Sequence, residues 1–174
     1  MTARRSGSET VRRLAALVLA GALLAPAARA RAEQWGGIEP GESTMAVVKS
    51  LRGTPTRTTK QKVDGYDTEE WVYEDAKAPA GIRRLTVDFG LVISSGYRPD
   101  LVRSLKLDPK PGAFDKDAIT TGWGPPAGLG KEGDVEFFFY KEGLFVYFAK
   151  DGHGVATMTF TPPQLPPMGT PPPR

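Results

Sequence analysis

The chain has 174 residues, 40% hydrophobic and 25% charged, as is typical of a soluble protein with one domain or two very small ones. It contains no cysteine, which excludes disulfide bonds, thiolate metal sites, a cysteine nucleophile and a lipidated N-terminal cysteine. Residues 1–32 hold six of the 23 basic residues and one of the 20 acidic residues, so residues 33–174 carry a net charge of about −2. The basic character belongs to the N-terminus and gives no argument for a nucleic-acid partner.

The N-terminal segment, residues 1–32, follows the plan of a secretory signal peptide. Arginines precede an apolar run at residues 14–25, and small residues with A-x-A spacing end at Ala30 and Ala32. The apolar run is much shorter than the roughly 20 residues that a membrane-spanning helix needs, so we expect no membrane span. Cleavage near Ala30 or Ala32 would give a mature protein that is periplasmic or secreted.

The first predicted element is a helix at residues 42–51, capped by Ser43 or Thr44, because Met45, Val48 and Leu51 form an apolar stripe at helical spacing. The Gly-Thr-Pro sequence at residues 53–55 ends it. After it, the pattern predicts a polar connection at residues 56–68 with a turn at Asp64-Gly65, strands at 71–73, 85–89 and 91–93, and a polar link to about residue 108.

A second copy of this layout follows. Four groups of residues recur at an offset of 71: Pro40-Gly41 as Pro111-Gly112, Val48 as Ile119, Gly53 as Gly124, and Pro55 as Pro126. At smaller offsets Trp71 and Tyr73 correspond to Phe137 and Phe139, and Leu85, Val87 and Phe89 to Leu144, Val146 and Phe148. We therefore expect an α+β fold of two tandem repeats, at residues 33–104 and 105–161, each a short helix or helical pair packed on a small antiparallel meander.

The aromatic stretch Val135–Phe160 predicts a three-stranded meander with turns at Glu142-Gly143 and Asp151-Gly152. Register from these turns sets Phe138 opposite Tyr147 and Phe139 opposite Val146, and leaves both sheet faces apolar. One face packs on the helix around Ile119. The other is either covered by the first repeat or free to bind a partner protein, and its binding candidates are Phe138, Tyr140, Phe145, Tyr147 and Met158.

Catalytic chemistry has little support in the sequence. The single histidine, His153, lies in the turn-like sequence Asp-Gly-His-Gly, and no phosphate loop, serine elbow or metal-ligand pair is recognisable. The acidic residues between Asp64 and Asp75 fit a solvated strand edge better than a calcium loop. We expect neither an enzyme nor a cofactor or metal. Residues 162–174 contain many prolines and predict an extended, disordered tail.

The run of Ile38, Pro40-Gly41, Val48, Leu51, Gly53-Thr54-Pro55, Trp71 and Tyr73 resembles the SmpA/OmlA family of accessory lipoproteins of outer-membrane β-barrel assembly. Two such units in tandem are similar to the secreted β-lactamase inhibitor proteins. The resemblance implies the helix-plus-meander fold. The family's lipidated cysteine is absent here, and so are the inhibitors' disulfides.

Together these features predict a secreted, non-catalytic protein-binding module, such as an inhibitor, that binds another envelope or extracellular protein through an aromatic sheet face. The alternative is a structural accessory factor of outer-membrane or envelope assembly. An enzyme would need a cleft of perturbed carboxylates that the sequence does not reveal.

Overall fold

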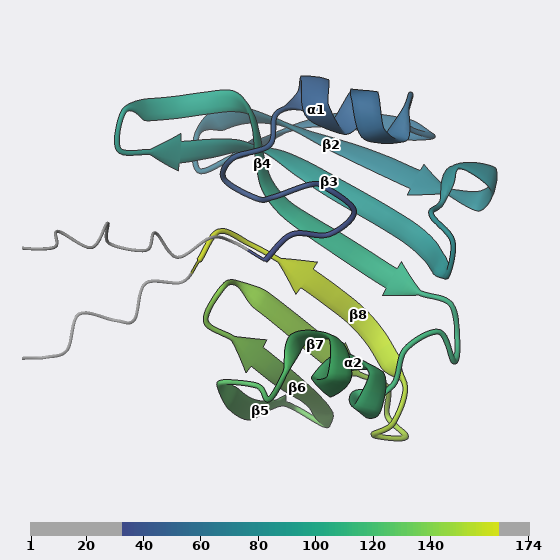
Figure 1. The fold of residues 1–174 in the computed structure, drawn as a ribbon. Coiled ribbons are helices and arrows are strands. Elements are labelled where there is room, and N and C mark those ends of the chain that lie inside the picture. The colour runs from purple at the N-terminus through teal and green to yellow at the C-terminus, as the bar shows by residue number, and fades with distance from the viewer. Residues whose placement is uncertain (1–32, 164–174) are drawn as a thin grey trace, which may run out of the picture.

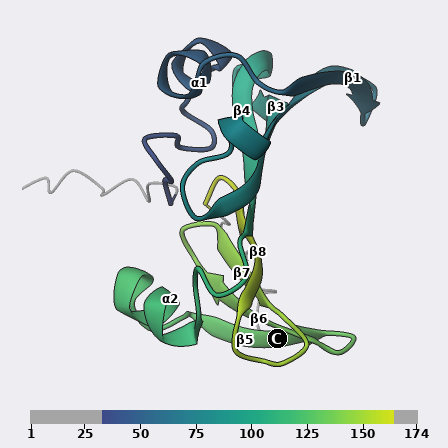
Figure 2. The same cartoon turned by 90° about the vertical axis from the view of Figure 1, so that its right-hand side faces the viewer.

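The computed structural model describes residues 33–163, which form one eight-stranded antiparallel sheet with two short helices on the same side of it (Figures 1 and 2). The fold is mostly β, rather than the α+β fold that the sequence predicts. The expected signal peptide and residues 164–174 of the expected tail lie outside the described residues. No helix within residues 33–163 is long and apolar enough to cross a membrane.

Each helix is followed by four strands. The first set is α1 (Met45–Arg52), β1 (Arg57–Val63), β2 (Tyr66–Glu74), a 3-10 turn at Asp75–Lys77, β3 (Ile82–Ile93) and β4 (Gly96–Pro109). The second set is α2 (Lys116–Trp123), β5 (Gly128–Glu132), β6 (Val135–Tyr140), β7 (Leu144–Phe148) and β8 (Val155–Phe160). The strand order across the sheet is β1-β2-β3-β4-β8-β7-β6-β5, so two meanders meet along β4 and β8.

Helix α1 begins and ends at the predicted signals. The Thr44 side chain accepts a hydrogen bond from the Val47 amide, and Gly53 follows the helix with a φ of 73° that favours glycine. Val48 is fully buried, but Leu51 is 48% exposed, so the predicted buried stripe is wrong at Leu51. A helix of barely two turns completely buries only one central position against the sheet.

Helix α2 repeats this capping with a different residue. The Asp115 carboxylate accepts a hydrogen bond from the Ala118 amide at 2.7 Å, and Gly124 follows the helix with a φ of 78°. Ile119 is the buried residue of α2. Both helices are thus bounded by local side-chain and glycine chemistry, and each has one apolar residue that is completely buried against the sheet.

Strands β1 and β4 occupy stretches where the sequence predicts polar links. β1 and β2 form a hairpin around Asp64-Gly65, whose φ values of 53° and 84° are those of a tight two-residue hairpin turn. β4 is the longest strand, and it accommodates Pro99 where β8 does not pair with it, because that ladder spans only Leu105–Leu107. The hydrophobic pattern misses β1 because this edge strand is exposed along almost its whole length.

A single hydrophobic core runs beneath both meanders on the helix side of the sheet. At the β4–β8 junction Leu105 pairs with Phe160 and Leu107 with Met158, and all four side chains are fully buried. The expected boundary after residue 104 falls inside β4. The large side chains that are completely buried are Tyr73, Phe89, Phe148, Phe160, Ile38, Ile82, Leu85, Leu105, Leu107, Ile119, Leu144 and Met158.

Candidate functional site: the open face of the sheet

The sheet has one covered face and one open face. Both α1 and α2 lie on the same side of the strands, and Figure 2 shows no described helix on the other side. Because side chains alternate between the faces, every second residue of each strand points to the side without helices. We call that side the open face. It would be expected to carry mainly polar residues, and in the first meander it does.

The open face of the second meander carries four neighbouring aromatic side chains. They are Phe137 and Phe139 on β6, and Phe145 and Tyr147 on β7. The ring centroids lie 5.5 Å apart for Phe137 and Tyr147, 5.0 Å for Phe139 and Phe145, and 6.5 Å for Phe137 and Phe145. All four residues are half-buried, so the rings shield one another and remain accessible from solvent. We call these four residues the aromatic cluster.

Two glycines let the aromatic cluster extend to the edge of the sheet. Gly128 and Gly130 on β5 pair with Phe139 and Phe137, and a Cβ atom at Gly130 would collide with the Phe137 ring. The Phe137 ring therefore lies across the backbone of the edge strand. This arrangement covers the glycines with an aromatic surface.

The register of β6 against β7 decides which aromatic residues lie on the open face. β6 and β7 pair through Phe137 and Tyr147, Phe138 and Val146, Phe139 and Phe145, and Tyr140 and Leu144. The predicted register is therefore wrong by one residue. The hairpin loop has three residues, 141–143, and ends at Gly143 with a φ of 102°, whereas the prediction assumed a two-residue loop. A one-residue slip moves every side chain of a strand to the opposite face.

The five predicted binding candidates are consequently divided between the two faces. Phe145 and Tyr147 lie on the open face. Phe138, Tyr140 and Met158 lie on the helix side, so the prediction that all five share a face is wrong. Sequence reasoning missed Phe137 and Phe139 as open-face residues. The signal that identifies them is the spacing of three residues between Tyr140 and Leu144, because a three-residue loop sets the register that turns Phe137 and Phe139 to the open face.

The three helix-side candidates have structural contacts. Phe138 packs edge-on against Phe148, with their ring centroids 4.6 Å apart. Tyr140 is 3% exposed and its hydroxyl donates a hydrogen bond to the Gly124 carbonyl at 3.1 Å. Burial, followed by the nearby Glu33 carboxylate, raises the pKa of Tyr140 above its usual value. Met158 is fully buried in the core.

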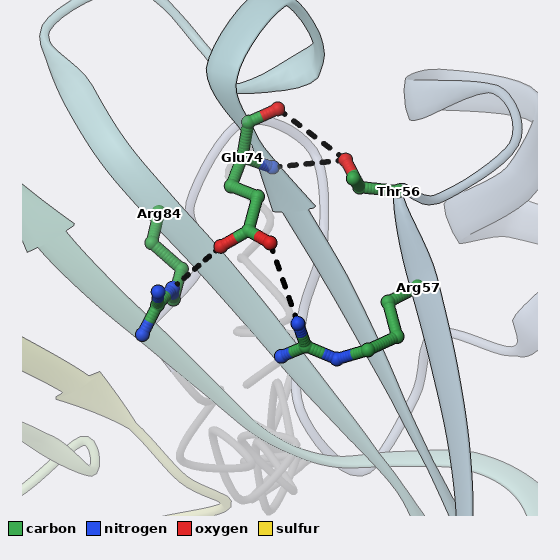
Figure 3. A network of polar contacts seen from close by, with 4 residues as sticks. All are labelled: Thr56, Arg57, Glu74 and Arg84. Carbon is green, nitrogen blue, oxygen red and sulfur yellow. Dashed lines mark hydrogen bonds and ion pairs between the residues drawn. The ribbon is translucent and has the colours of Figure 1, made fainter.

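The open face of the first meander is polar. Glu74 lies between two arginines, accepting from Arg84 Nε at 3.0 Å and from Arg57 Nη1 at 3.4 Å, and its backbone exchanges hydrogen bonds with the Thr56 hydroxyl (Figure 3). Asp88 accepts from the Ser104 hydroxyl at 2.7 Å and is also paired with Arg103. Such partly exposed pairs contribute little to stability, so the polar half serves mainly to keep this part of the face solvated.

The remaining residues singled out in the sequence have local roles. The Asp151 carboxylate accepts hydrogen bonds from the His153 and Gly154 amides, first of all from His153, and these bonds lower the pKa of Asp151. His153 is therefore a turn residue with an exposed side chain, as predicted. Trp71 and Tyr73 are buried, and Trp123 packs against the core. Within residues 33–163 no group of His, Asp and Glu side chains is placed to hold a metal ion.

Comparisons with known proteins give one solved structure. No family model matches the chain, and no curated protein matches it. The solved structure is YjgB, a DUF4309 family protein from Bacillus subtilis, which has 11% sequence identity and a TM-score of 0.47 over 76% of this chain and 88% of that chain. The expected SmpA/OmlA resemblance is wrong: no model of that family matches the chain, and the described residues form one continuous eight-stranded sheet.

Proposed function

We propose that this chain is a non-catalytic protein-binding module that acts after export, in the periplasm or outside the cell, and captures a partner protein through the aromatic cluster. The observation that carries the proposal is that Phe137, Phe139, Phe145 and Tyr147 lie together on a face that no described helix covers. Partly exposed aromatic side chains concentrate binding energy in protein interfaces.

A comparison of the two halves supports the proposal. We infer that the chain arose by duplication of a helix-plus-four-strand unit, because buried contacts recur at corresponding positions. The Tyr73 hydroxyl donates to Gly53 O at 3.2 Å as that of Tyr140 donates to Gly124 O. Trp71 also packs edge-on against Phe89, with centroids 4.8 Å apart, as Phe138 does against Phe148. In this correspondence Trp71 and Tyr73 match Phe138 and Tyr140, one residue later than the sequence offsets suggest.

The pairing at the centre of the sheet agrees with such a duplication. In the first half Val87 pairs with Leu105, and in the second half Val146 pairs with Met158. These correspondences make Lys106 and Thr159 equivalent, and they are the central pair of the β4–β8 ladder. An approximate two-fold axis would then pass between Lys106 and Thr159 and relate one meander to the other.

The same correspondence provides an internal control for the aromatic cluster. Phe137 and Tyr147 form a pair on the open face, and the corresponding pair in the first meander is Glu70 and Asp88. Phe139 and Phe145 likewise correspond to Val72 and Thr86. The first meander therefore folds with two carboxylates and a threonine at three of these positions, and with Val72, which is 1% exposed, at the fourth. The core contacts recur in both halves and the open-face aromatics do not, which favours a role in binding over a role in folding.

The experiment compares two double variants of the exported protein. Phe145→Ala with Tyr147→Ala removes part of the aromatic cluster, and Thr86→Ala with Asp88→Ala truncates the two corresponding polar positions. The unmodified protein and both variants are used as bait for envelope and secreted proteins of the source organism. Each retained protein is identified and purified, and its affinity for the unmodified protein and for each variant is measured by calorimetry. We expect the aromatic variant to lose at least about tenfold in affinity and the polar variant to bind as the unmodified protein does.

Circular dichroism and thermal melting establish that both variants are folded. A folded aromatic variant with unchanged partner affinity would contradict the proposal. If Phe145→Ala with Tyr147→Ala unfolds, the single variant Tyr147→Ser replaces it, because Tyr147 corresponds to a position that holds Asp88 in the other half.

A further inference from the structure

The aromatic cluster continues into a groove toward the centre of the sheet. The groove has a volume of about 480 Å³, within the range of about 300–1,000 Å³ typical of ligand pockets, and its lining includes Tyr147, Val135, Thr157, Thr159, Lys106 and Lys150. Tyr147 and Val135 give it an apolar wall. The threonines and lysines come from β8, β4 and the turn after β7.

The two lysines of the groove are free to bind an anion. Lys106 and Lys150 are both exposed, and neither forms an ion pair with any residue in the range 33–163. No Asp or Glu lines the groove. The chain from residue 33 onward has a net charge of about −2. The groove has two unpaired ammonium groups and no carboxylate, so its local charge is positive whereas that of the chain as a whole is negative.

Two acidic side chains on the open face, those of Asp108 and Asp88, already have partners. Asp108 accepts a hydrogen bond from the Thr157 hydroxyl at 3.1 Å, and Asp88 is bound by Ser104 and Arg103. The hydroxyl of Thr159, beside Lys106, has no hydrogen-bond partner within the described residues and is available as a donor. Donors in this groove therefore exceed acceptors, which is the pattern that a carboxylate ligand requires.

We propose that the groove binds an acidic segment of the partner protein, with an Asp or Glu carboxylate at Lys106 and Lys150 and a neighbouring apolar or aromatic side chain against Tyr147. This inference rests on the proposed function and specifies the class of partner. Lysine supplies a charge without the fixed geometry of a guanidinium, so the groove selects for negative charge beside an apolar group rather than for one bidentate carboxylate.

The test uses two synthetic peptides that are identical except at the positions flanking a central Trp, which are Glu in one peptide and Lys in the other. Binding to the isotopically labelled full-length mature protein is followed by NMR shifts of the Tyr147, Thr157 and Thr159 amides. We expect the acidic peptide to bind at least about fivefold more tightly than the basic peptide, and this preference to shrink as the salt concentration rises.

Two double variants with the same change in net charge locate the effect. Lys106→Ala with Lys150→Ala removes the ammonium groups of the groove and should abolish the preference for the acidic peptide. Lys49→Ala with Lys60→Ala removes two exposed lysines that lie outside the groove and should leave the preference intact.

Equal binding of the two peptides at the aromatic cluster would overturn the acidic class while leaving the proposed function in place. Absence of shifts in the groove with either peptide would also overturn the inference, whereas the proposed function is decided separately by capture with the Phe145→Ala and Tyr147→Ala variant. Binding of vesicles containing anionic phospholipid through the same lysines, as tightly as the acidic peptide, would assign the groove to a lipid surface and contradict a protein segment as its ligand.

Discussion

The hydroxyl of Tyr140 on β6 donates a hydrogen bond to the carbonyl of Gly124, the residue that follows the last residue of α2. Carbonyls at the C-terminal end of a helix lack partners within the helix, so this bond satisfies one of them and connects the helix to the sheet. Tyr73 on β2 donates in the same way to Gly53 after α1. Both helices are short, and each depends on such a tertiary contact.

Removal of either hydroxyl should destabilise the fold modestly. Tyr73→Phe and Tyr140→Phe each delete one hydrogen bond and leave a poorly solvated carbonyl, so each should lower the free energy of unfolding by about 1 kcal/mol. The bonds lie in different halves and share no residue, so the double variant should show the sum. Urea unfolding curves provide the measurement, and a double variant no less stable than either single variant would contradict the independence of the two contacts.

Alkaline pH should act on the fold through Tyr73. Burial raises the pKa of Tyr73 to about 12, and the neighbouring Arg52 opposes this in part. Because the folded-state pKa lies above the unfolded value of about 10, the folded state holds the proton more tightly between these two pH values. Stability from this group is therefore complete below about pH 10 and decreases as the pH rises toward 12.

The control for this pH dependence is Tyr73→Phe, which should flatten the decrease in melting temperature over the same pH range. Tyrosinate absorbance, followed during an alkaline titration of the folded protein, should show one fewer late-titrating tyrosine in the variant. An unchanged pH profile would assign the alkaline transition to other groups.

Gly143 should tolerate alanine far less well than Gly65 does. Both residues have positive φ values, 102° and 84°, so alanine is strained at either position. A Cβ at Gly143 would also collide with the backbone of Thr161 and Pro162, whereas at Gly65 it would point into open space. We expect Gly65→Ala to cost about 1 kcal/mol and Gly143→Ala clearly more, in urea unfolding, because backbone atoms cannot move aside as a side chain can. Equal costs would mean that the loop relaxes away from Thr161.

Gly130 should affect the open face more than it affects stability. Alanine at Gly130 would displace the Phe137 ring, a movable side chain, so we expect a loss of about 1 kcal/mol or less together with changed NMR ring signals of Phe137 and Tyr147. Gly122→Ala in α2 is the matched control, because it has open space around it and no positive φ. Gly122→Ala should stabilise the protein by up to about 1 kcal/mol through helix propensity and leave the aromatic signals unchanged. Unaltered ring signals in Gly130→Ala would show that the ring does not lie across β5.

Those elements whose signals are local could be predicted from the amino-acid sequence. Gly53 and Gly124 ended both helices as predicted, Asp64-Gly65 formed the first hairpin turn, and Val48 and Ile119 were buried. Alternation along β3 and β7 identified their buried residues, from Leu85 and from Leu144 onward. These features follow from backbone sterics and from the two-residue period of a strand, which act over a few neighbouring residues.

The distribution of the aromatic residues between the two faces of the sheet depends on long-range packing. Because the loop before Leu144 has three residues, the register of β6 against β7 differs by one residue from the predicted register. Phe137 and Phe139 therefore lie with Phe145 and Tyr147 on the open face, and Phe138 and Tyr140 lie on the helix side. Local propensity hardly distinguishes these two registers, because both place aromatic residues on each face. Burial of Tyr140 beneath the end of α2 favours the observed register.

The joining of β4 to β8 was likewise invisible in the sequence. Lys106 and Thr159 are brought opposite each other by pairing between strands that are distant in the chain, and such a ladder leaves no periodic signal in either strand. β1 was missed because an edge strand with polar residues on both sides has no hydrophobic alternation. The placement of both helices on one side, which leaves the aromatic cluster uncovered, is a consequence of packing the whole chain around one core.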